Sequence, residues 1–158
     1  MKTEKIGDWE KAIKAAMEVK ALMEKEQLKV LGEFAEKGLE LLKGHIDAQD
    51  LDWRPLSDAY LEQKAAEGSA LETWVRSQSL YDSLVAIAEK GMAFAGVPEG
   101  EQTETGERMV DIAAIHEFGA LSVGIYERPL FRPTMEEMMA WLGEQKPAEN
   151  IKNELNNL

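Results

Sequence analysis

Residues 9–46 read WEKAIKAAMEVKALMEKEQLKVLGEFAEKGLELLKGHI, a stretch without proline in which alanine, leucine, methionine, glutamate and lysine predominate. All five residue types are favourable in the interior of a helix. Asp8 precedes the stretch and is suited to cap it, because its carboxylate can accept hydrogen bonds from the free amides of the first turn. The sequence therefore predicts one long helix of about 35 residues, roughly 50 Å in length at 1.5 Å per residue.

Apolar residues recur along this stretch at the three- and four-residue spacing of one helix face. A five-residue step from Met23 to Leu28 interrupts the spacing, and a bend is expected near Glu24–Gly32. A helix this long exceeds the core of a 158-residue domain. Two interpretations follow: the apolar face packs on the rest of the chain, or part of it packs against a neighbouring subunit. The apolar positions are Trp9, Ile13, Ala16, Met17 and Met23, then Leu28, Leu31, Ala35, Leu39, Leu42 and Ile46.

The charge is distributed unevenly along the chain. The 158 residues carry 18 Lys and Arg against 30 Asp and Glu, a formal net charge of −12. Residues 1–46 contain nine Lys and nine acidic residues, so the whole excess lies in residues 47–158. With no repeat or linker, we expect a single domain, residues 1–158, composed of the long helix (1–46) and an acidic body (47–158).

Composition excludes several classes of protein. An acidic chain is unsuited to tight binding of a phosphate backbone, which requires clustered Lys and Arg. No stretch approaches the ~20 apolar residues of a membrane span. Residues 1–7 lack the apolar run of a signal peptide, and there is no cysteine for a disulfide, a thiolate nucleophile or a Cys-type zinc site. A cytosolic origin is expected.

The acidic body predicts an α+β fold: the long N-terminal helix, a small antiparallel sheet packed with short helices, and a C-terminal helix. Ser57 is suited to cap a second helix that ends at Gly68. Residues 84–90 and 92–97 are expected to pair as a hairpin around Gly91, with residues 121–126 as a third strand. A helix is expected at 110–118, ended by Gly119. Residues 128–133 are expected to be extended, and Thr134 to cap the last helix.

The search for catalytic motifs finds little. His116-Glu117 resembles the start of a zinc-protease HExxH motif, but Ala120 stands where the second histidine is required. There is no Gly-x-Ser-x-Gly nucleophile elbow, phosphate-binding loop or GxGxxG fingerprint. The many carboxylates are typical of a solvated acidic surface. The sequence therefore predicts no enzyme, no cofactor and no metal site.

Two groups of residues stand out from this composition. The first is Trp53-Arg-Pro-Leu-Ser-x-x-Tyr60-x-x-x-Lys64, followed by Ser79-Leu-Tyr-Asp-Ser-Leu84. The second is Ile112-Ala-Ala-Ile-His-Glu-Phe-Gly119, followed by Glu127-Arg-Pro-Leu-Phe-Arg-Pro133.

In order and spacing, these groups resemble the phage virion-morphogenesis family, the Mu-like and siphophage tail-completion components of the head–tail junction. The resemblance spans Trp53 to Trp141. This chain departs from the family pattern at Ser77-Gln78-Ser79, at Glu127, and in the order of Leu130 and Phe131. The matching positions are Trp53, Pro55, Leu56, Tyr60, Lys64, Leu80, Ser83, His116, Glu117, Phe118, Gly119, Arg128, Pro129, Phe131, Arg132 and Pro133.

The resemblance implies a non-enzymatic virion protein of the neck, formed in the host cytoplasm during assembly. It would build a homo-oligomeric ring, by resemblance a hexamer, that joins tail to head and lets DNA pass. Its partners would be like subunits and neighbouring neck and tail proteins, with no membrane and no specific nucleic-acid binding. Two alternatives stay open: an assembly factor absent from the mature particle, and a small hydrolase using His116 and Glu117.

The motif residues have expected physical roles. Gly119 is expected to be left-handed, with Phe118 packing back onto the core. His116 is either a hydrogen-bonded structural residue or a pH-sensing or interface group. Glu117 is a candidate partner for Arg128 or Arg132, because a guanidinium suits a carboxylate. Pro129 and Pro133 preorganise a segment that either covers the core or docks another subunit.

The acidic residues before the helix at 110–118 suggest a lining for a DNA path. A ring lumen of Asp and Glu would repel phosphate and avoid holding the passing polyanion. The alternative is a mobile, solvated acidic loop. The residues concerned are Glu99, Glu101, Glu104, Glu107 and Asp111.

Overall fold

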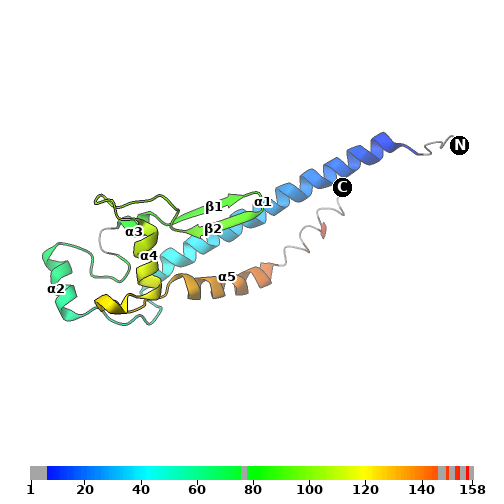
Figure 1. Ribbon diagram of the computed structural model, residues 1–158. Helices are drawn as coiled ribbons and strands as arrows, with labels where there is room; N and C mark the ends of the chain where they lie inside the picture. Colours follow the sequence, from blue (N-terminus) through cyan, green and yellow to red (C-terminus); the bar gives the residue numbers. More distant parts are fainter. Residues whose placement is uncertain (1–6, 76–77, 146–148, 150–151, 154–155, 157–158) are drawn as a thin grey trace.

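A computed structural model describes residues 7–75, 78–145, 149, 152–153 and 156 of the chain. It shows the expected α+β fold, with a long helix from which the other elements extend on one side (Figure 1). The elements in chain order are α1 (Trp9–Ala48), α2 (Asp58–Ala66), α3 (Ser79–Asp82), β1 (Val85–Glu89), β2 (Met92–Gly96), α4 (Met109–Phe118), the 3-10 helix η1 (Leu121–Val123) and α5 (Phe131–Gln145).

The long helix α1 is confirmed and has 40 residues. The Asp8 carboxylate accepts a hydrogen bond from the Lys11 amide at 3.2 Å, as the cap prediction requires. The helix continues through Glu24–Gly32 as one element, so the five-residue step in the apolar spacing does not interrupt it. It ends at Gln49, whose φ of 53° is left-handed.

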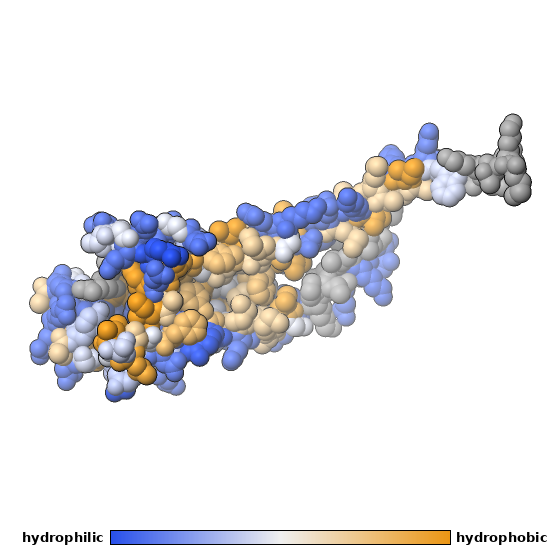
Figure 2. Space-filling view, viewed as in Figure 1, coloured by the Kyte–Doolittle hydropathy of each residue, from blue (hydrophilic) through white to orange (hydrophobic). Residues whose placement is uncertain are grey.

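The two halves of α1 have different surroundings. The β-hairpin and α5 both pack on the C-terminal half, where Ala35, Leu42 and Ile46 are at most 2% exposed. The hairpin reaches as far back as Glu24, which accepts a 2.7 Å hydrogen bond from Lys90 beside the hairpin turn. Beyond that point the N-terminal half projects from the body, with apolar and polar residues on its surface (Figure 2). Among the described residues, the apolar face of α1 therefore packs on the chain's own body mainly in its C-terminal half.

The hairpin is confirmed as an antiparallel pair of strands, with Val85 opposite Gly96 and Ile87 opposite Phe94. The expected third strand at 121–126 is wrong. Residues 121–123 form η1, and only an isolated bridge joins Ala120 to Ile125. Leu121 and Val123 are more than 70% exposed, so the weak alternation there has no sheet or core to pack against.

The hydrophobic core lies at the C-terminal end of α1, where α3, α4 and the segment before α5 meet it (Figure 1). Leu130, at the start of α5, is completely buried. The ends of the short helices follow the predicted chemistry, since Ser57 Oγ accepts from the Tyr60 amide at 3.3 Å and Gly68 has a φ of +68°. The buried core residues are Leu42, Ile46, Trp74, Leu80, Leu84, Val97, Met109, Ala113 and Leu130.

None of the helices within the described residues is both long and apolar enough to cross a membrane.

Gly38 sets how closely α1 approaches its neighbours. A Cβ atom at this position would lie 2.7 Å from Met138 Sδ and 2.8 Å from Ala95 Cβ, both shorter than van der Waals contact. Met138 belongs to α5 and Ala95 to β2, so one glycine lets both elements lie against α1. Gly44 lies in the same helix, and no atom of another described segment is within 4 Å of its Cβ position.

Gly38→Ala should therefore lower the free energy of unfolding by up to about 2 kcal/mol, because an overpacking cost of ~1–3 kcal/mol opposes the ~1 kcal/mol gained from helix propensity. Gly44→Ala is the matched control and should raise the free energy of unfolding by roughly 0.5–1 kcal/mol, because alanine is more favourable than glycine inside a helix. Urea unfolding followed by circular dichroism measures both. An equal gain in the two variants would contradict the close packing described here.

Candidate functional site

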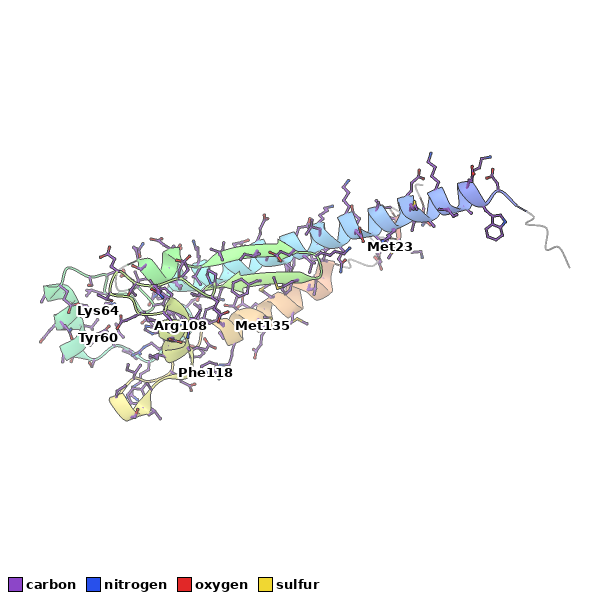
Figure 3. The ribbon with its side chains drawn as sticks, turned by 45° about the horizontal axis from the view of Figure 1, so that its top comes forward. Met23, Tyr60, Lys64, Arg108, Phe118 and Met135 are labelled. Atoms are coloured by element: carbon purple, nitrogen blue, oxygen red, sulfur yellow. The ribbon has the colours of Figure 1, made fainter. Side chains whose placement is uncertain are left out.

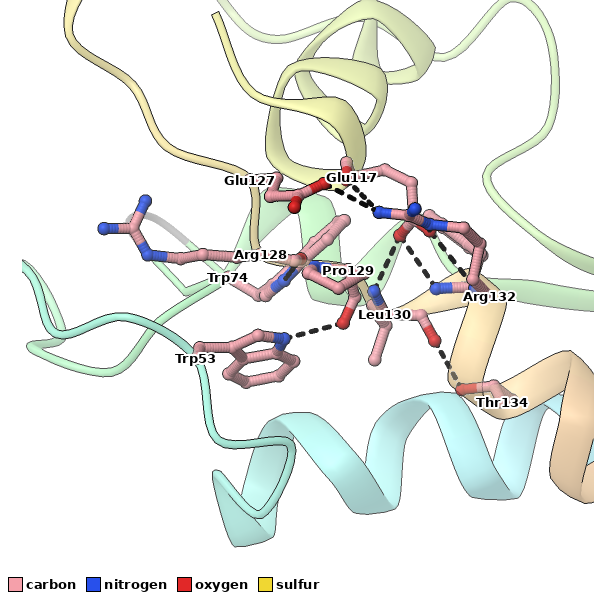
Figure 4. A network of polar contacts seen from close by, with 10 residues as sticks. Trp53, Trp74, Glu117, Glu127, Arg128, Pro129, Leu130, Arg132 and Thr134 are labelled. Atoms are coloured by element: carbon pink, nitrogen blue, oxygen red, sulfur yellow. Dashed lines mark hydrogen bonds and ion pairs between the residues drawn. The ribbon is translucent and has the colours of Figure 1, made fainter. Parts of the chain in front are cut away.

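Three segments that carry the sequence motifs meet at the C-terminal end of α1 (Figure 4). They are the loop before α2, the end of α4, and residues 127–133, which lead into α5. The indole N–H of Trp53 donates to the Pro129 carbonyl at 2.7 Å and joins the first segment to the third. We call this group the motif cluster: Trp53, Trp74, Glu117, Arg128, Pro129, Leu130, Arg132.

Glu117 is the centre of the motif cluster and is 3% exposed. Its carboxylate accepts hydrogen bonds from the backbone amides of Leu130 at 2.6 Å, Phe131 at 2.9 Å and Arg132 at 3.1 Å. It also accepts from Arg132 Nε at 3.1 Å. A buried carboxylate needs this many donors, because an unpaired charge away from water is strongly unfavourable.

These contacts account for the free amides at the start of α5. The first four N–H groups of a helix have no partner within the helix. Here three of them donate to Glu117, and the fourth is absent because Pro133 has no N–H. The first intrahelical bond follows, from the Thr134 amide to the Leu130 carbonyl at 3.2 Å. Glu117 therefore caps α5 from another helix, and its negative charge lies at the positive end of the helix dipole.

This arrangement corrects two predictions. Residues 128–133 are not extended throughout, because α5 begins at Phe131 and Pro133 lies in its first turn, where a proline φ is favourable. Thr134 does not cap the helix. Its Oγ1 donates to the Leu130 carbonyl at 2.7 Å, one turn back.

Of the two arginines considered as partners for Glu117, Arg132 is the one that contacts it. Arg132 Nη2 also donates to Glu127 at 3.0 Å, and the hydrogen bonds that Arg132 donates to Glu127 and Glu117 raise the pKa of Arg132. Arg128 instead donates to two backbone carbonyls, of Arg54 at 3.1 Å and of Tyr126 at 3.3 Å. Burial lowers the pKa of Arg128.

Trp74 also packs against residues 127–133, although it lies outside the motifs. Its indole N–H donates to the Arg128 carbonyl at 3.0 Å, and its ring lies edge-on to Phe131 with centroids 5.7 Å apart. Its φ of +67° is unusual for a bulky residue and costs roughly 1–3 kcal/mol. The one signal in the sequence was a large aromatic residue in a mainly polar stretch.

Side chains from α1 and α2 hold the loop that carries Trp74. Gln49 makes a pair of hydrogen bonds to the Thr73 backbone, accepting at 2.9 Å and donating at 3.0 Å. Lys64 is 2% exposed and donates to the carbonyls of Glu72 and Val75, each at 2.8 Å. The motif residue Lys64 thus has a structural role, and Figure 3 shows it on α2 beside Tyr60, whose ring centroid lies 5.9 Å from the Lys64 nitrogen.

The other residues of the first motif group lie apart from the cluster's hydrogen bonds. Leu80 and Ser83 are buried, and the Ser83 hydroxyl donates to the Leu80 carbonyl at 2.7 Å. Leu56 is half-buried and Pro55 is exposed.

Gly119 is required for two reasons. Its φ of +74° disfavours any side chain, and a Cβ would lie 2.8 Å from the Glu127 nitrogen. Its ψ of 172° differs from the left-handed helical conformation that was expected. The prediction that Phe118 packs onto the core is wrong, because Phe118 is 68% exposed. The buried face of α4 passes through Ala113 and Glu117, and Phe118 lies about 100° around the helix from Glu117.

His116 packs its ring on Trp74, with centroids 4.9 Å apart. Within the part of the chain that the structure describes, its Nδ1 is buried without a hydrogen-bond partner, so the ring is held at that atom by packing and not by a hydrogen bond. Burial, followed by the positive charges of Arg128 and Lys64, lowers the pKa of His116 to about 4. The imidazole is therefore neutral near pH 7.

The hydrolase alternative would need the Glu117 carboxylate to take a proton from a substrate. That carboxylate is 3% exposed and accepts hydrogen bonds from three backbone amides and from Arg132 Nε. Within the described residues, no group of three or more His, Cys, Asp or Glu is placed to hold a metal ion.

The five acidic residues considered as a DNA-path lining are all exposed, on the segment between β2 and α4 and at the start of α4. This segment folds back on itself, since the Met109 amide donates to the Glu101 carbonyl at 2.9 Å. Arg108 lies among them, 3.9 Å from Glu99 and 3.8 Å from Asp111 (Figure 3).

Comparisons of the chain with protein-family models, with curated proteins and with solved structures found no match.

Glu117→Gln should lower the free energy of unfolding by about 2–3 kcal/mol, because charge-assisted bonds are lost and the new amide group opposes a backbone N–H. The matched control is Glu127→Gln, which removes the exposed partner of the same Arg132 and should have a much smaller effect. Urea unfolding at neutral pH compares them. Equal losses would show that the cap of α5 is not the dominant contribution.

The low pKa of His116 predicts a pH dependence. An unfolded histidine has a pKa near 6.5, so between pH ~6.5 and ~4 the unfolded chain binds the extra proton and stability falls as pH falls. The total loss is at most about 3 kcal/mol and is complete below pH ~4. His116→Phe, which keeps a stacked ring, and His116→Gln should both remove this contribution. The free energy of unfolding should be measured across that pH range. If it changes with pH equally in the wild type and in both variants, the low pKa of His116 is contradicted.

Proposed function

We propose that this chain is a non-enzymatic structural protein of the phage head–tail junction. In this proposal, copies of the chain form a ring that joins the tail to the head and lets DNA pass through. The subunits assemble in the host cytoplasm and remain in the virion.

The observation that carries the proposal is the order and spacing of the motifs from Trp53 to Pro133, which resemble the tail-completion family. Hydrogen bonds in the structure connect those motifs to one another. Trp53 from the first segment and Glu117 from the second both make hydrogen bonds to residues 129–132 of the third. Residues that form one physical unit are expected to occur together in a sequence family, which supports the reading of the motifs as a set.

Exposed apolar residues further support a role in assembly. Phe118, Leu121 and Val123 are between 68% and 73% exposed, and all lie within six residues of one another. Exposed apolar side chains that cluster on a surface are typical of a contact with another protein. A joint between head and tail must offer such surfaces both to like subunits and to its neighbours.

The acidic segment between β2 and α4 would face the passing DNA. Carboxylates there would repel phosphate and would not release counterions, so they would not retain the genome. Arg108, which lies near two of them, leaves most of the negative charge uncompensated.

Deletion of the gene from the phage or prophage that carries it tests the proposal. We expect filled heads and finished tails that stay separate under negative-stain electron microscopy, with infectivity restored by the wild-type gene in trans. Mass spectrometry of purified particles should detect the chain. Charge reversal of the five acidic residues in the same assay should impair genome retention or ejection.

Other results of these experiments would lead to different conclusions. Joined, infectious particles without the protein would overturn the proposal. A joining defect with no chain in the mature particle would support the assembly-factor alternative. Unimpaired retention and ejection in the charge-reversed variant would remove the DNA-path role of the acidic segment and leave the joint itself intact.

A further inference from the structure

An apolar groove of about 420 Å³ lies between β2, α4 and α5. Its two charged lining residues, Glu117 and Arg132, bind each other in the motif cluster. Figure 2 shows apolar residues gathered over this part of the molecule. The side chains that shape the groove include Phe94, Val110, Ala114, Phe118, Phe131 and Met135.

The apolar surface extends beyond the groove along α5. Met135 and Met139 are 52% and 58% exposed and lie one helical turn apart. Phe118 stands on the opposite wall, and Figure 3 shows Phe118 and Met135 close to each other. A groove continued by a line of apolar side chains is shaped for a helix rather than for a compact small molecule, since helix-in-groove recognition uses anchors spaced along one face.

The projecting end of α1 provides a helix face of this kind. Trp9, Ile13 and Met17 are 57%, 55% and 66% exposed and follow at four-residue intervals. Their spacing of about 6 Å along the helix matches the anchor pattern of a groove-bound helix. We call residues 9–23 of α1 the arm.

The arm of a molecule is unable to reach its own groove. Gly38 holds α1 directly against Met138 and Ala95, beside the groove. Trp9 lies 29 residues before Gly38 in one continuous helix, which places it about 44 Å away. Figure 1 shows that end of α1 projecting away from α4. The occupant of the groove must come from another molecule.

Charge favours the arm of a second copy. Residues 47–158 carry the whole net charge of −12, so two bodies repel each other. Residues 1–46 are neutral and bring lysines beside the apolar stripe, including Lys14 and Lys20. Two exposed acidic residues directly follow lining residues in the sequence: Asp111 follows Val110 on α4, and Glu136 follows Met135 on α5. The arm is thus the part of this chain that approaches an acidic body without repulsion.

We propose that the arm of one molecule docks in the groove of the next, with Trp9, Ile13 and Met17 packed between α4 and α5. The inference rests on the proposed function, because it supplies the subunit contact that a ring joint requires. The contact is head-to-tail: each subunit uses its arm toward one neighbour and its groove toward the other. Repetition of such a contact gives a closed ring or an open filament.

Two full-length variants test this contact. Trp9→Glu with Ile13→Glu disables the arm, and Phe118→Glu with Met135→Glu disables the groove. Sedimentation velocity should show the wild type as a concentration-dependent oligomer. Each variant alone should be monomeric, with self-association at least about 30-fold weaker. A one-to-one mixture should give a dimer and nothing larger, because one intact arm meets one intact groove.

The matched control is Leu71→Glu, an apolar-to-acidic change at a half-exposed residue outside both surfaces. It should assemble like the wild type, and circular dichroism should show all variants folded. A wild type that stays monomeric at every concentration overturns the inference, as does an oligomer that survives both variants. A mixture that stays monomeric also overturns it.

Cross-linking gives a second readout, because the chain has no cysteine of its own. Ile13→Cys with Ala114→Cys in one chain should yield a ladder of disulfide-linked species at multiples of the 17.7 kDa monomer mass. Glu18→Cys with Ala114→Cys is the control, since Glu18 lies on the opposite face of α1, and it should yield little ladder. Equal ladders, or a monomer only, contradict arm-in-groove docking.

These results separate the inference from the proposed function. If particles need the chain for joining but assemble normally with the arm variant, the docking contact is wrong and the joint stands. If the arm and groove associate in solution but particles form without the chain, the docking contact stands and the proposed function falls.

Discussion

The hydrogen bonds that the Glu117 carboxylate accepts are the interaction on which the rest of the acidic body depends. This carboxylate satisfies three amides of α5 and the guanidinium of Arg132 while remaining almost fully buried. A helix normally finds its cap in the residue just before it, so its start depends on local sequence alone. Here the cap comes from α4, so the start of α5 at Phe131 depends on a contact with another helix. The packing of α5 on α1 through Met138 and Gly38 follows from that start.

The segment between α4 and α5 is held from both sides. The indole N–H groups of Trp53 and Trp74 donate hydrogen bonds to the carbonyls of Pro129 and Arg128, respectively. The Arg128 amide in turn donates to the His116 carbonyl at 2.7 Å. Buried backbone groups in a loop need partners, and two tryptophans supply them while adding apolar surface. The unfavourable φ of Trp74 is tolerated because these hydrogen bonds and the stacked ring of His116 over-determine its position.

The features predicted correctly from sequence are those specified by neighbouring residues. The long helix, its Asp8 cap, the hairpin around Gly91 and the end of α2 at Gly68 depend on propensity and on turn chemistry within a few positions. The errors concern long-range contacts. Thr134 has the chemistry of a cap, but a carboxylate from another helix fills that role. Phe118 was expected in the core, although the buried face of α4 is defined by Glu117, a charged residue that no hydrophobic pattern would place inside. Trp74 and Gln49 joined the site through contacts that span 54 and 24 residues.

The motif cluster and the groove share residues and depend on the same packing of α4 against α5. Glu117 and Arg132 belong to the cluster and also line the groove, as does Phe131, whose amide donates to Glu117, so the cap that starts α5 also sets the spacing of the groove's two helical walls. Phe118 stays outside because its neighbour Glu117 points inward, and this leaves an aromatic side chain at the groove's edge. In the proposed docking of the arm, the buried motif would govern assembly without touching a partner. Its residues position α4 against α5, and the exposed residues beside them are those that the proposed contact uses.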